Sequence, residues 1–255
     1  MSIEIKGVII GEGKPKVCVP IVEDHDEAIL NKLKEFNELE VDMIELRIDY
    51  YKNIHQEDAL KNLFLNIAAL QIQKPIILTN RTLKEGGQIE VEDQEYYKIY
   101  QIAVETGAFD IYDVELSAGT NMAIELRTLI HDANKYMLMS SHNFSRTPEV
   151  DSLMQKFRSM DSFEADIMKI AVMPEDYQDL LNLLSFTVQA KQEYSQKPIV
   201  TMSMSSIGLT SRLVGEQFGS AITFASVGKA SAPGQIDYQE LNQMLDIIHK
   251  NIQEA

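Results

Sequence analysis

Short apolar runs alternate with longer amphipathic stretches along the whole chain. Eight runs are rich in Val, Ile and Met, and their starts are 22 to 34 residues apart. This spacing is typical of a strand followed by a crossover helix. The runs occupy residues 17–22, 43–48, 75–79, 109–116, 136–141, 166–172, 198–204 and 220–226.

The stretches between the runs have apolar residues at helical spacing. In 27–36, for example, Ile29, Leu33 and Phe36 recur along one face of a predicted helix. Similar patterns predict helices at 57–71, 93–106, 121–134, 150–160, 175–193, 210–218 and 238–252. Eight strand and helix pairs favour a closed parallel barrel.

We therefore expect a single-domain (β/α)8 TIM barrel that spans residues 1–255. Such a barrel has about 250 residues. Two small domains also fit the length, but no Pro/Gly/Ser-rich linker divides the chain. An open doubly wound sheet is the competing fold; it normally has a glycine-rich turn after its first strand, and none follows Val22. Residues 3–13 alternate weakly, and we expect an N-terminal hairpin at the barrel floor.

The chain carries 23 Lys and Arg against 39 Asp and Glu, a formal net charge of −16. We expect this charge to repel nucleic acid and anionic membrane surfaces, whereas a local group of arginines still binds a small anion. Cys18 is the only cysteine and lies in an apolar run, so we expect it to pack in the core. The sequence shows neither an apolar signal region nor an uncharged stretch long enough to span a bilayer, which predicts a cytoplasmic location.

Lys169 lies inside the apolar run at 166–172, an unusual place for a charge if the strand is covered on both faces. One interpretation is a lysine near a strand end, with its stem packed and its head in water. The other is an amine that points into a site, where burial disfavours the charged form and favours attack on a carbonyl. Polar residues in the neighbouring runs favour the second interpretation.

Polar side chains stand at the ends of several predicted strands, where a parallel barrel builds its active site. In 43–49 the alternation places Glu45, Arg47 and Asp49 on one face, which should point inward because a barrel has no edge strand. The alternative is a buried ion pair that holds the strand register. Further polar residues at later strand ends, or in the loops after them, are Arg81, Glu85, Asp113, Glu115, His142 and Arg212.

Asp113 and Glu115 share one face of their strand, and we expect them to pair with the inward arginines. The five histidines have no paired spacing that suits a metal, so no metal site is expected. What remains is an amine on one strand, His142 on the adjacent predicted strand, and several guanidinium groups. This combination is typical of imine chemistry on an anionic carbonyl compound.

Six short motifs follow one another along the chain. They are ELRID at 45–49, Arg81 with KEGG at 84–87, SHNF at 141–144, KIAVMP at 169–174, TMSM at 201–204 and ASAPGQ at 230–235. Together they resemble type I 3-dehydroquinate dehydratase, a shikimate-pathway enzyme family with an α/β barrel fold. The resemblance extends from residue 11 to the last helix, and it implies elimination of water from 3-dehydroquinate to give 3-dehydroshikimate.

The resemblance also implies a role for each matching position. Lys169 would form a Schiff base with the substrate ketone, His142 would move protons, and Glu85 would orient His142. The implied substrate-binding residues are Glu45, Arg47 and Arg81 at the ring hydroxyls and neighbouring polar groups, and Arg212, Ser231 and Gln235 at the carboxylate. No cofactor is implied, because the lysine is itself the electron sink, and the family expectation is a homodimer.

Two other functions stay open at this point. A class I aldolase or transaldolase-like barrel also uses a strand lysine, but its phosphate site should appear as glycine-rich turns after the last two strands, which 231–234 fits poorly. A non-catalytic binding barrel would keep the arginines without requiring Lys169 and His142 together. The chain also differs from some members of the resembled family at Pro20, Leu46 and Gly228. We expect these differences to affect the affinity for substrate and not the reaction itself.

Overall fold

The computed structural model describes residues 2–228 and 232–253. In this part of the chain eight parallel strands form one sheet in the order β10-β3-β4-β5-β6-β7-β8-β9. They are β3 (Lys16–Ile21), β4 (Met43–Arg47), β5 (Ile76–Thr79), β6 (Ile111–Glu115), β7 (Tyr136–Asn143), β8 (Ile167–Val172), β9 (Ile199–Ser203) and β10 (Ile222–Phe224). The sheet closes on itself, because Ser220 bridges Ile199 and the Ala221 N–H donates to the Ile199 carbonyl over 2.7 Å.

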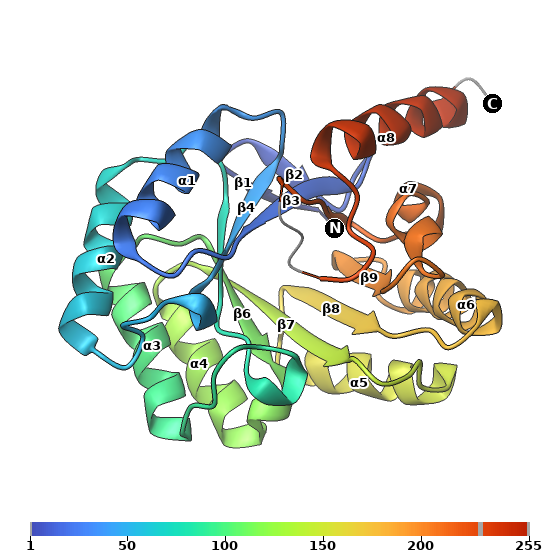
Figure 1. The fold of residues 1–255 in the computed structure, drawn as a ribbon. Coiled ribbons are helices and arrows are strands. Elements are labelled where there is room, and N and C mark those ends of the chain that lie inside the picture. Colours follow the sequence, from blue (N-terminus) through green and yellow to red (C-terminus); the bar gives the residue numbers. More distant parts are fainter. Residues whose placement is uncertain (1, 229–231, 254–255) are drawn as a thin grey trace.

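Helices follow the strands and cover the outside of the barrel (Figure 1). They are α1 (Asp26–Glu38), α2 (Glu57–Ala69), α3 (Asp93–Thr106), α4 (Thr120–Asp132), α5 (Val150–Ser162), α6 (Tyr177–Glu193), α7 (Gly215–Phe218) and α8 (Tyr238–Gln253). Short 3-10 helices follow four of the strands: η1 (Ile48–Tyr50), η2 (Leu83–Glu85), η3 (Leu116–Ala118) and η4 (Leu209–Arg212). This alternation confirms the predicted (β/α)8 TIM barrel.

The single helix expected at 210–218 is wrong. The 3-10 helix η4 and the four-residue helix α7 occupy this region, with a break between them. The Ser211 hydroxyl accepts a hydrogen bond from the Ser203 N–H (2.9 Å) and donates to the Gly208 carbonyl (2.7 Å), so it competes with regular helical hydrogen bonds. The resulting tight turn leaves Arg212 at the end of η4.

The barrel floor is apolar and is closed by the N-terminal hairpin. β1 (Ile3–Ile5) pairs antiparallel with β2 (Val8–Ile10), which confirms the expected hairpin. Ile5 and Ile10 belong to a buried cluster that also contains Cys18, Met43, Ile77, Ile111, Leu138, Ile167, Val200 and Ile222. Cys18 is fully buried there, as predicted. This cluster excludes water from the barrel below the polar residues that follow.

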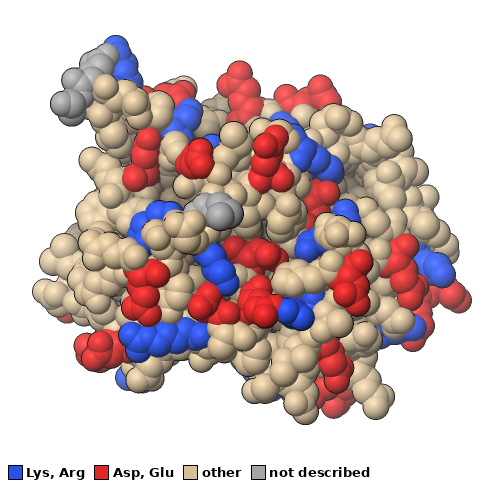
Figure 2. All heavy atoms as spheres, turned by 180° about the vertical axis from the view of Figure 1, so that it is seen from behind, with Lys and Arg blue, Asp and Glu red and all other residues tan. Residues whose placement is uncertain are grey.

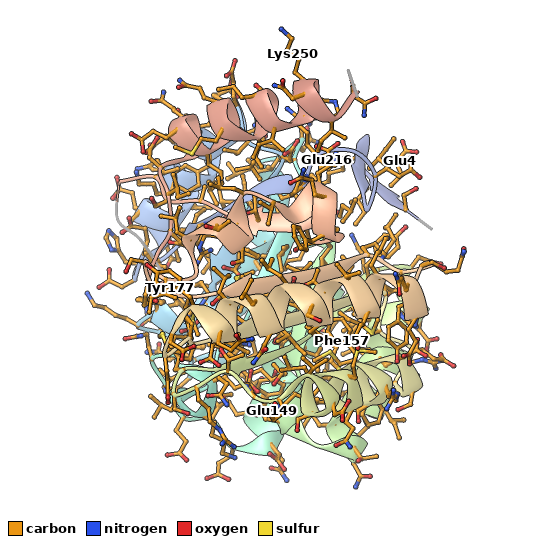
Figure 3. The ribbon with its side chains drawn as sticks, turned by 90° about the vertical axis from the view of Figure 1, so that its right-hand side faces the viewer. Glu4, Glu149, Phe157, Tyr177, Glu216 and Lys250 are labelled. Carbon is orange, nitrogen blue, oxygen red and sulfur yellow. The ribbon has the colours of Figure 1, made fainter. Side chains whose placement is uncertain are left out.

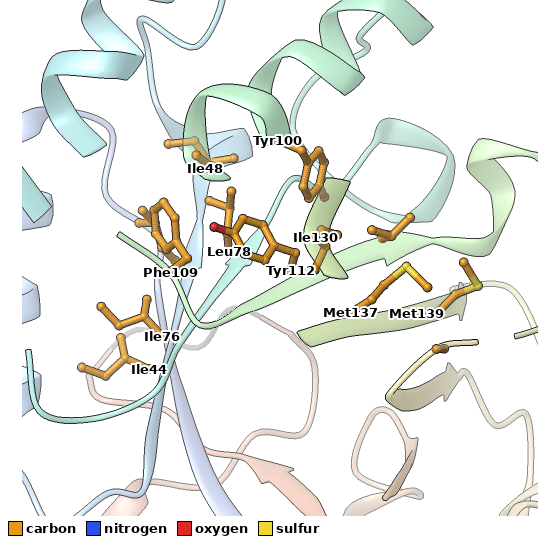
Figure 4. Packing of buried hydrophobic residues seen from close by; sticks show 14 of the residues in the cluster. Ile44, Ile48, Ile76, Leu78, Tyr100, Phe109, Tyr112, Ile130, Met137 and Met139 are labelled. Carbon is orange, nitrogen blue, oxygen red and sulfur yellow. The ribbon is translucent and has the colours of Figure 1, made fainter. Parts of the chain in front are cut away.

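A second apolar layer joins the strands to the helices. Figure 4 shows Phe109 and Tyr112 within this layer, with their ring centroids 6.2 Å apart in an edge-on arrangement. Phe157 of α5 meets Phe186 of α6 at 4.9 Å, whereas Tyr177 at the start of α6 is exposed to solvent (Figure 3). Each fully buried ring contributes about 1.5–3 kcal/mol relative to an exposed one, so the layer holds the strands in fixed positions.

The surface carries many acidic side chains. Figure 2 shows one face of the molecule, on which Asp and Glu side chains stand among Lys and Arg side chains. Over residues 2–228 and 232–253, no helix is both long enough and apolar enough to cross a membrane.

Candidate active site

The inner face of the barrel becomes polar toward the carboxyl ends of the strands, and a cavity lies there. Its ionisable lining residues are Glu45, Arg47, Arg81, Glu85, His142, Lys169 and Arg212. More open grooves occur on the surface, such as one between α3 and α4, but the residues that line it include no lysine, arginine or histidine. The cavity at the strand ends is therefore the candidate site, as expected for a parallel barrel.

Lys169 lies on the inner face of β8, and its side chain is 5% exposed. Its Nζ is 3.3 Å from Asp113 Oδ2, 3.7 Å from Glu45 Oε1 and 4.4 Å from the centroid of the Phe224 ring. The amine therefore points into the cavity and not into solvent. The sequence pattern alone did not place the two carboxylates beside this amine.

Arg81 follows β5 and binds the acidic residues of the inner face. Its NH2 is 2.6 Å from Asp113 Oδ2, and its NH1 is 3.0 Å from Glu115 Oε1. Burial alone would raise the pKa of Asp113, but the Arg81 guanidinium and the Lys169 amine hold it below its usual range. The prediction that Asp113 and Glu115 pair with an inward arginine is thus confirmed.

His142 and Glu85 meet at the mouth of the barrel. His142 lies near the end of β7, and Glu85 is the last residue of η2. Glu85 Oε2 accepts the backbone N–H of His142 at 2.9 Å and lies 3.0 Å from Nδ1 of its ring. Glu85 Oε1 accepts a hydrogen bond from the Ser117 hydroxyl at 2.7 Å. The carboxylate is therefore fixed at both oxygens and can orient the imidazole.

Burial shifts the pKa values of these two groups in opposite directions. Burial, together with the positive charges of Arg81 and Lys169, lowers the pKa of His142 well below its usual value. Burial also raises the pKa of Glu85, although the Arg81 guanidinium opposes this shift. The imidazole is accordingly uncharged at neutral pH and able to accept a proton.

The predicted charged face of β4 and η1 points into the barrel. Glu45 Oε1 accepts a hydrogen bond from the Thr79 hydroxyl at 2.9 Å. Arg47 donates from Nε (2.8 Å) and NH2 (2.7 Å) to the two carboxylate oxygens of Asp49. Both interpretations of this face therefore apply, since it lines the cavity and also contains a buried ion pair.

Arg212 differs from the other arginines of the cavity. It is 2% exposed, and its guanidinium donates to the carbonyl oxygens of Pro233 (3.1 Å) and Phe224 (3.4 Å). No carboxylate lies within ion-pair distance of it in the described part of the chain. Burial lowers its pKa to about 10, which leaves the group charged at neutral pH. A buried cation without a counter-ion favours an anionic ligand.

The structure brings eight of the nine predicted site residues to one cavity. They are Glu45, Arg47, Arg81, Glu85, His142, Lys169, Arg212 and Gln235. The ninth, Ser231, lies outside the described residues. In the described ranges, no group of three or more His, Cys, Asp or Glu side chains is arranged to hold a metal ion.

Sequence reasoning did not select two aromatic residues that line the cavity, Phe144 and Phe224. Phe224 lies on β10, where it pairs in register with inward-facing Cys18. The alternation of inward and outward residues along this strand is the signal that could have identified Phe224. Phe144 follows β7 in an irregular loop and packs against Gly86, where the Phe144 ring leaves no room for a side chain. The φ of 83° at Gly86 also favours glycine. No periodicity marks such a contact.

Comparison with known proteins identifies the family of the chain. A family model described as type I 3-dehydroquinase matches residues 17–252. The chain belongs to this family. It is 41% identical to the 3-dehydroquinate dehydratase of Bacillus subtilis (strain 168) over 97% of each chain. It is 42% identical to that of Enterococcus faecalis, over 97% of this chain and 98% of the relative.

A solved relative has the same fold over almost the full length. The type I 3-dehydroquinate dehydratase from Clostridium difficile, determined with covalent modified comenic acid, superposes with a TM-score of 0.94 at 35% identity. The match covers 98% of this chain and 99% of that one. Family membership makes this chain a hydro-lyase and confirms the resemblance carried by the six motifs. It does not support the aldolase or the non-catalytic barrel.

Proposed function

We propose that the enzyme eliminates water from 3-dehydroquinate to give 3-dehydroshikimate, a step of the shikimate pathway, through an imine on Lys169. The observation that carries the mechanism is the Lys169 amine, which is buried on the inner face of β8 and faces the cavity. Family membership supports the reaction, and the neutral imidazole of His142 supports the mechanism.

The charges of the cavity support one orientation of the substrate. Arg212 lacks a carboxylate partner among the described residues, so it binds the substrate carboxylate, together with Gln235 of the same cavity. The resemblance adds Ser231 to this group, a residue outside the described part of the chain. Arg47 and Glu45 lie on β4 and bind the ring hydroxyls. Arg81 is held by ion pairs with Asp113 and Glu115, and it contributes positive charge near the ring hydroxyls.

Imine formation activates the substrate. The uncharged form of the Lys169 amine attacks the ketone carbon and forms a carbon–nitrogen bond. The ketone oxygen takes up one proton from the attacking amine and one from solvent and leaves as water, so that a protonated imine remains. A protonated imine withdraws electrons more strongly than the ketone does, so the adjacent C–H bond becomes acidic. The Asp113 and Glu45 carboxylates lie beside Nζ and stabilise the positive charge of the imine.

His142 then moves the proton. Its neutral ring removes a proton from the carbon next to the imine, and the electron pair forms an enamine. The enamine expels the β-hydroxyl group, to which the His142 imidazolium returns the proton, so water leaves. A second water hydrolyses the imine, and this step releases 3-dehydroshikimate and restores Lys169. The lysine accepts the electrons throughout, so no cofactor is needed.

A direct assay tests this function. Incubation with 3-dehydroquinate should increase the absorbance of the enone in the product, and the rate should scale with enzyme concentration. The aldolase alternative predicts cleavage of a carbon–carbon bond, which mass spectrometry of the products would detect as smaller fragments. A stable mixture with neither product would contradict both reactions.

Two further properties stay predictions from the sequence, namely a homodimer and a cytoplasmic location. The homodimer follows from the family expectation, and the cytoplasmic location from the sequence features given above. Sedimentation velocity of the purified protein at several concentrations tests the first, and fractionation of cells tests the second.

A further inference from the structure

Asp49 is buried directly after β4 and lies outside the cavity lining. It is 1% exposed and belongs to η1. Its Oδ1 accepts from Arg47 Nε at 2.8 Å and its Oδ2 from Arg47 NH2 at 2.7 Å. This side-on pair leaves NH1 and one N–H of NH2 free of Asp49, and these are the groups with which Arg47 can meet a ligand.

The same carboxylate also holds the backbone of the next strand and its loop. Asp49 Oδ1 accepts the Arg81 N–H at 3.4 Å, and Oδ2 accepts the Gln88 N–H at 3.2 Å. Residues 81 and 88 enclose the short segment that carries Glu85. One carboxylate thus connects a cavity arginine to the loop that orients His142.

Arg47 has a second carboxylate near it. Burial alone would lower its pKa, but the Asp49 carboxylate, and more weakly that of Glu45, raises the pKa. Glu45 also faces the Lys169 amine, at 3.7 Å. If Asp49 did not hold the guanidinium, Glu45 would be the acidic residue that still acts on Arg47, and Arg47 would compete with Lys169 for it.

We propose that Asp49 is a positioning residue for the reaction proposed above, on which this inference rests. It aims the Arg47 guanidinium at the substrate hydroxyls, keeps Glu45 available to Lys169, and fixes the segment that carries Glu85. Asp49 itself touches no substrate and acts through Arg47 and this segment.

A double-mutant cycle separates this role from a general effect on folding. Asp49→Asn keeps the shape of the side chain but removes its charge and one acceptor, so KM should rise by about 10–100-fold, the loss of a charged hydrogen bond to substrate. Arg47→Met should raise KM similarly. In the Arg47→Met background, Asp49→Asn should change KM less than about twofold, because the group that it aims is gone.

Asp110→Asn is the matched control. Asp110 also accepts a backbone N–H, from Ile76 at 2.9 Å, and pairs with Lys6 at 2.8 Å, but it lies at the opposite end of the barrel. This variant should leave KM unchanged. If Asp49→Asn does not fold, Asp49→Glu takes its place in the double-mutant cycle, because it keeps the negative charge opposite Arg47.

KM effects of Asp49 and Arg47 that multiply in the double variant would overturn the proposal, as would an Asp110→Asn variant with the same rise in KM. Borohydride trapping of the ligand on Lys169 distinguishes this failure from failure of the proposed function. If the imine mechanism is right and the positioning role is wrong, the wild type and Asp49→Asn both form the adduct while the KM cycle shows no coupling. If the wild type forms no adduct, the mechanism itself is wrong.

Discussion

Glu85 Oε2 contacts His142 twice, at the backbone N–H (2.9 Å) and at Nδ1 of the ring (3.0 Å). Because this oxygen already accepts the backbone N–H, it acts as an acceptor, and the facing Nδ1 carries the ring proton. The lone pair then lies on Nε2, at the other side of the ring. One carboxylate oxygen thus selects both the tautomer and the orientation of the imidazole.

The pH dependence of the reaction follows from this pair. The pKa of His142 is lowered by burial and by Arg81, so the base remains unprotonated below its usual pKa of about 6.5. We expect kcat/KM, which reports the free enzyme, to stay level through pH 6.5 and to fall only at lower pH, as His142 or Glu85 becomes protonated. A fall that begins above pH 7 would contradict the assignment of His142 as the base.

Removal of the base should separate two parts of the mechanism. His142→Ala should reduce kcat by about 10²–10⁴-fold, the usual contribution of general acid–base catalysis, yet Lys169 should still be trapped by borohydride in the presence of ligand. Steady-state kinetics and intact mass measure the two effects. His249→Ala is the control, because His249 forms a similar contact with Glu216 (2.7 Å) far from the cavity. Normal turnover in His142→Ala would show that another group moves the proton.

The orienting role of Glu85 has a milder signature. Glu85→Gln keeps the size of the side chain but removes the charge that stabilises the imidazolium, so the acid limb of kcat/KM should move to lower pH and kcat should fall less than in His142→Ala. A pH–rate series on both enzymes checks this. An unchanged acid limb would mean that Glu85 does not act on His142.

The imine itself can be trapped. Borohydride added with 3-dehydroquinate or 3-dehydroshikimate should inactivate the enzyme and add one ligand mass at Lys169, and Lys169→Met should not be labelled. Lys156 provides a control, since its Nζ binds the Ser141 hydroxyl (2.8 Å) on the outer side of β7. Lys156→Met should be labelled like the wild type. Peptide mapping that finds the adduct on another lysine would refute the assignment.

The order of strands and helices was predictable because each element buries one continuous face. The runs at 17–22 and 166–172, for example, match β3 and β8 within one residue at each end. The break within 210–218 was not predictable. There the Ser211 hydroxyl donates to the Gly208 carbonyl and accepts from the Ser203 N–H, and so competes with regular helical hydrogen bonds. Such a contact joins residues from two elements, and periodicity within one element does not record it.

The site divides in the same way. Strand alternation placed Glu45 and Arg47 on the inner face, the apolar run at 166–172 singled out Lys169, and the motifs supplied the remaining positions. The sequence did not reveal which acid neutralises which base. Asp113 binds both Arg81 and Lys169, and this depends on the relative register of three strands. The lack of a carboxylate partner for Arg212 among residues 2–228 and 232–253 likewise appears only once the acids of these ranges have been placed.

That unpaired cation leads to the last prediction. Arg212→Ala removes a charge-assisted hydrogen bond to the substrate carboxylate, so substrate and product should both bind more weakly, by about 1.5–3 kcal/mol. Calorimetric titration of 3-dehydroshikimate into the variant measures the loss. Arg158→Ala is the control, because Arg158 lies exposed on α5 and pairs with Glu193 at 3.3 Å. Among the described residues, no buried carboxylate depends on Arg212 for a counter-charge. The substitution therefore leaves no such carboxylate unpaired, and the fold should be retained. Unchanged affinity in a folded Arg212→Ala variant would place the carboxylate elsewhere in the cavity.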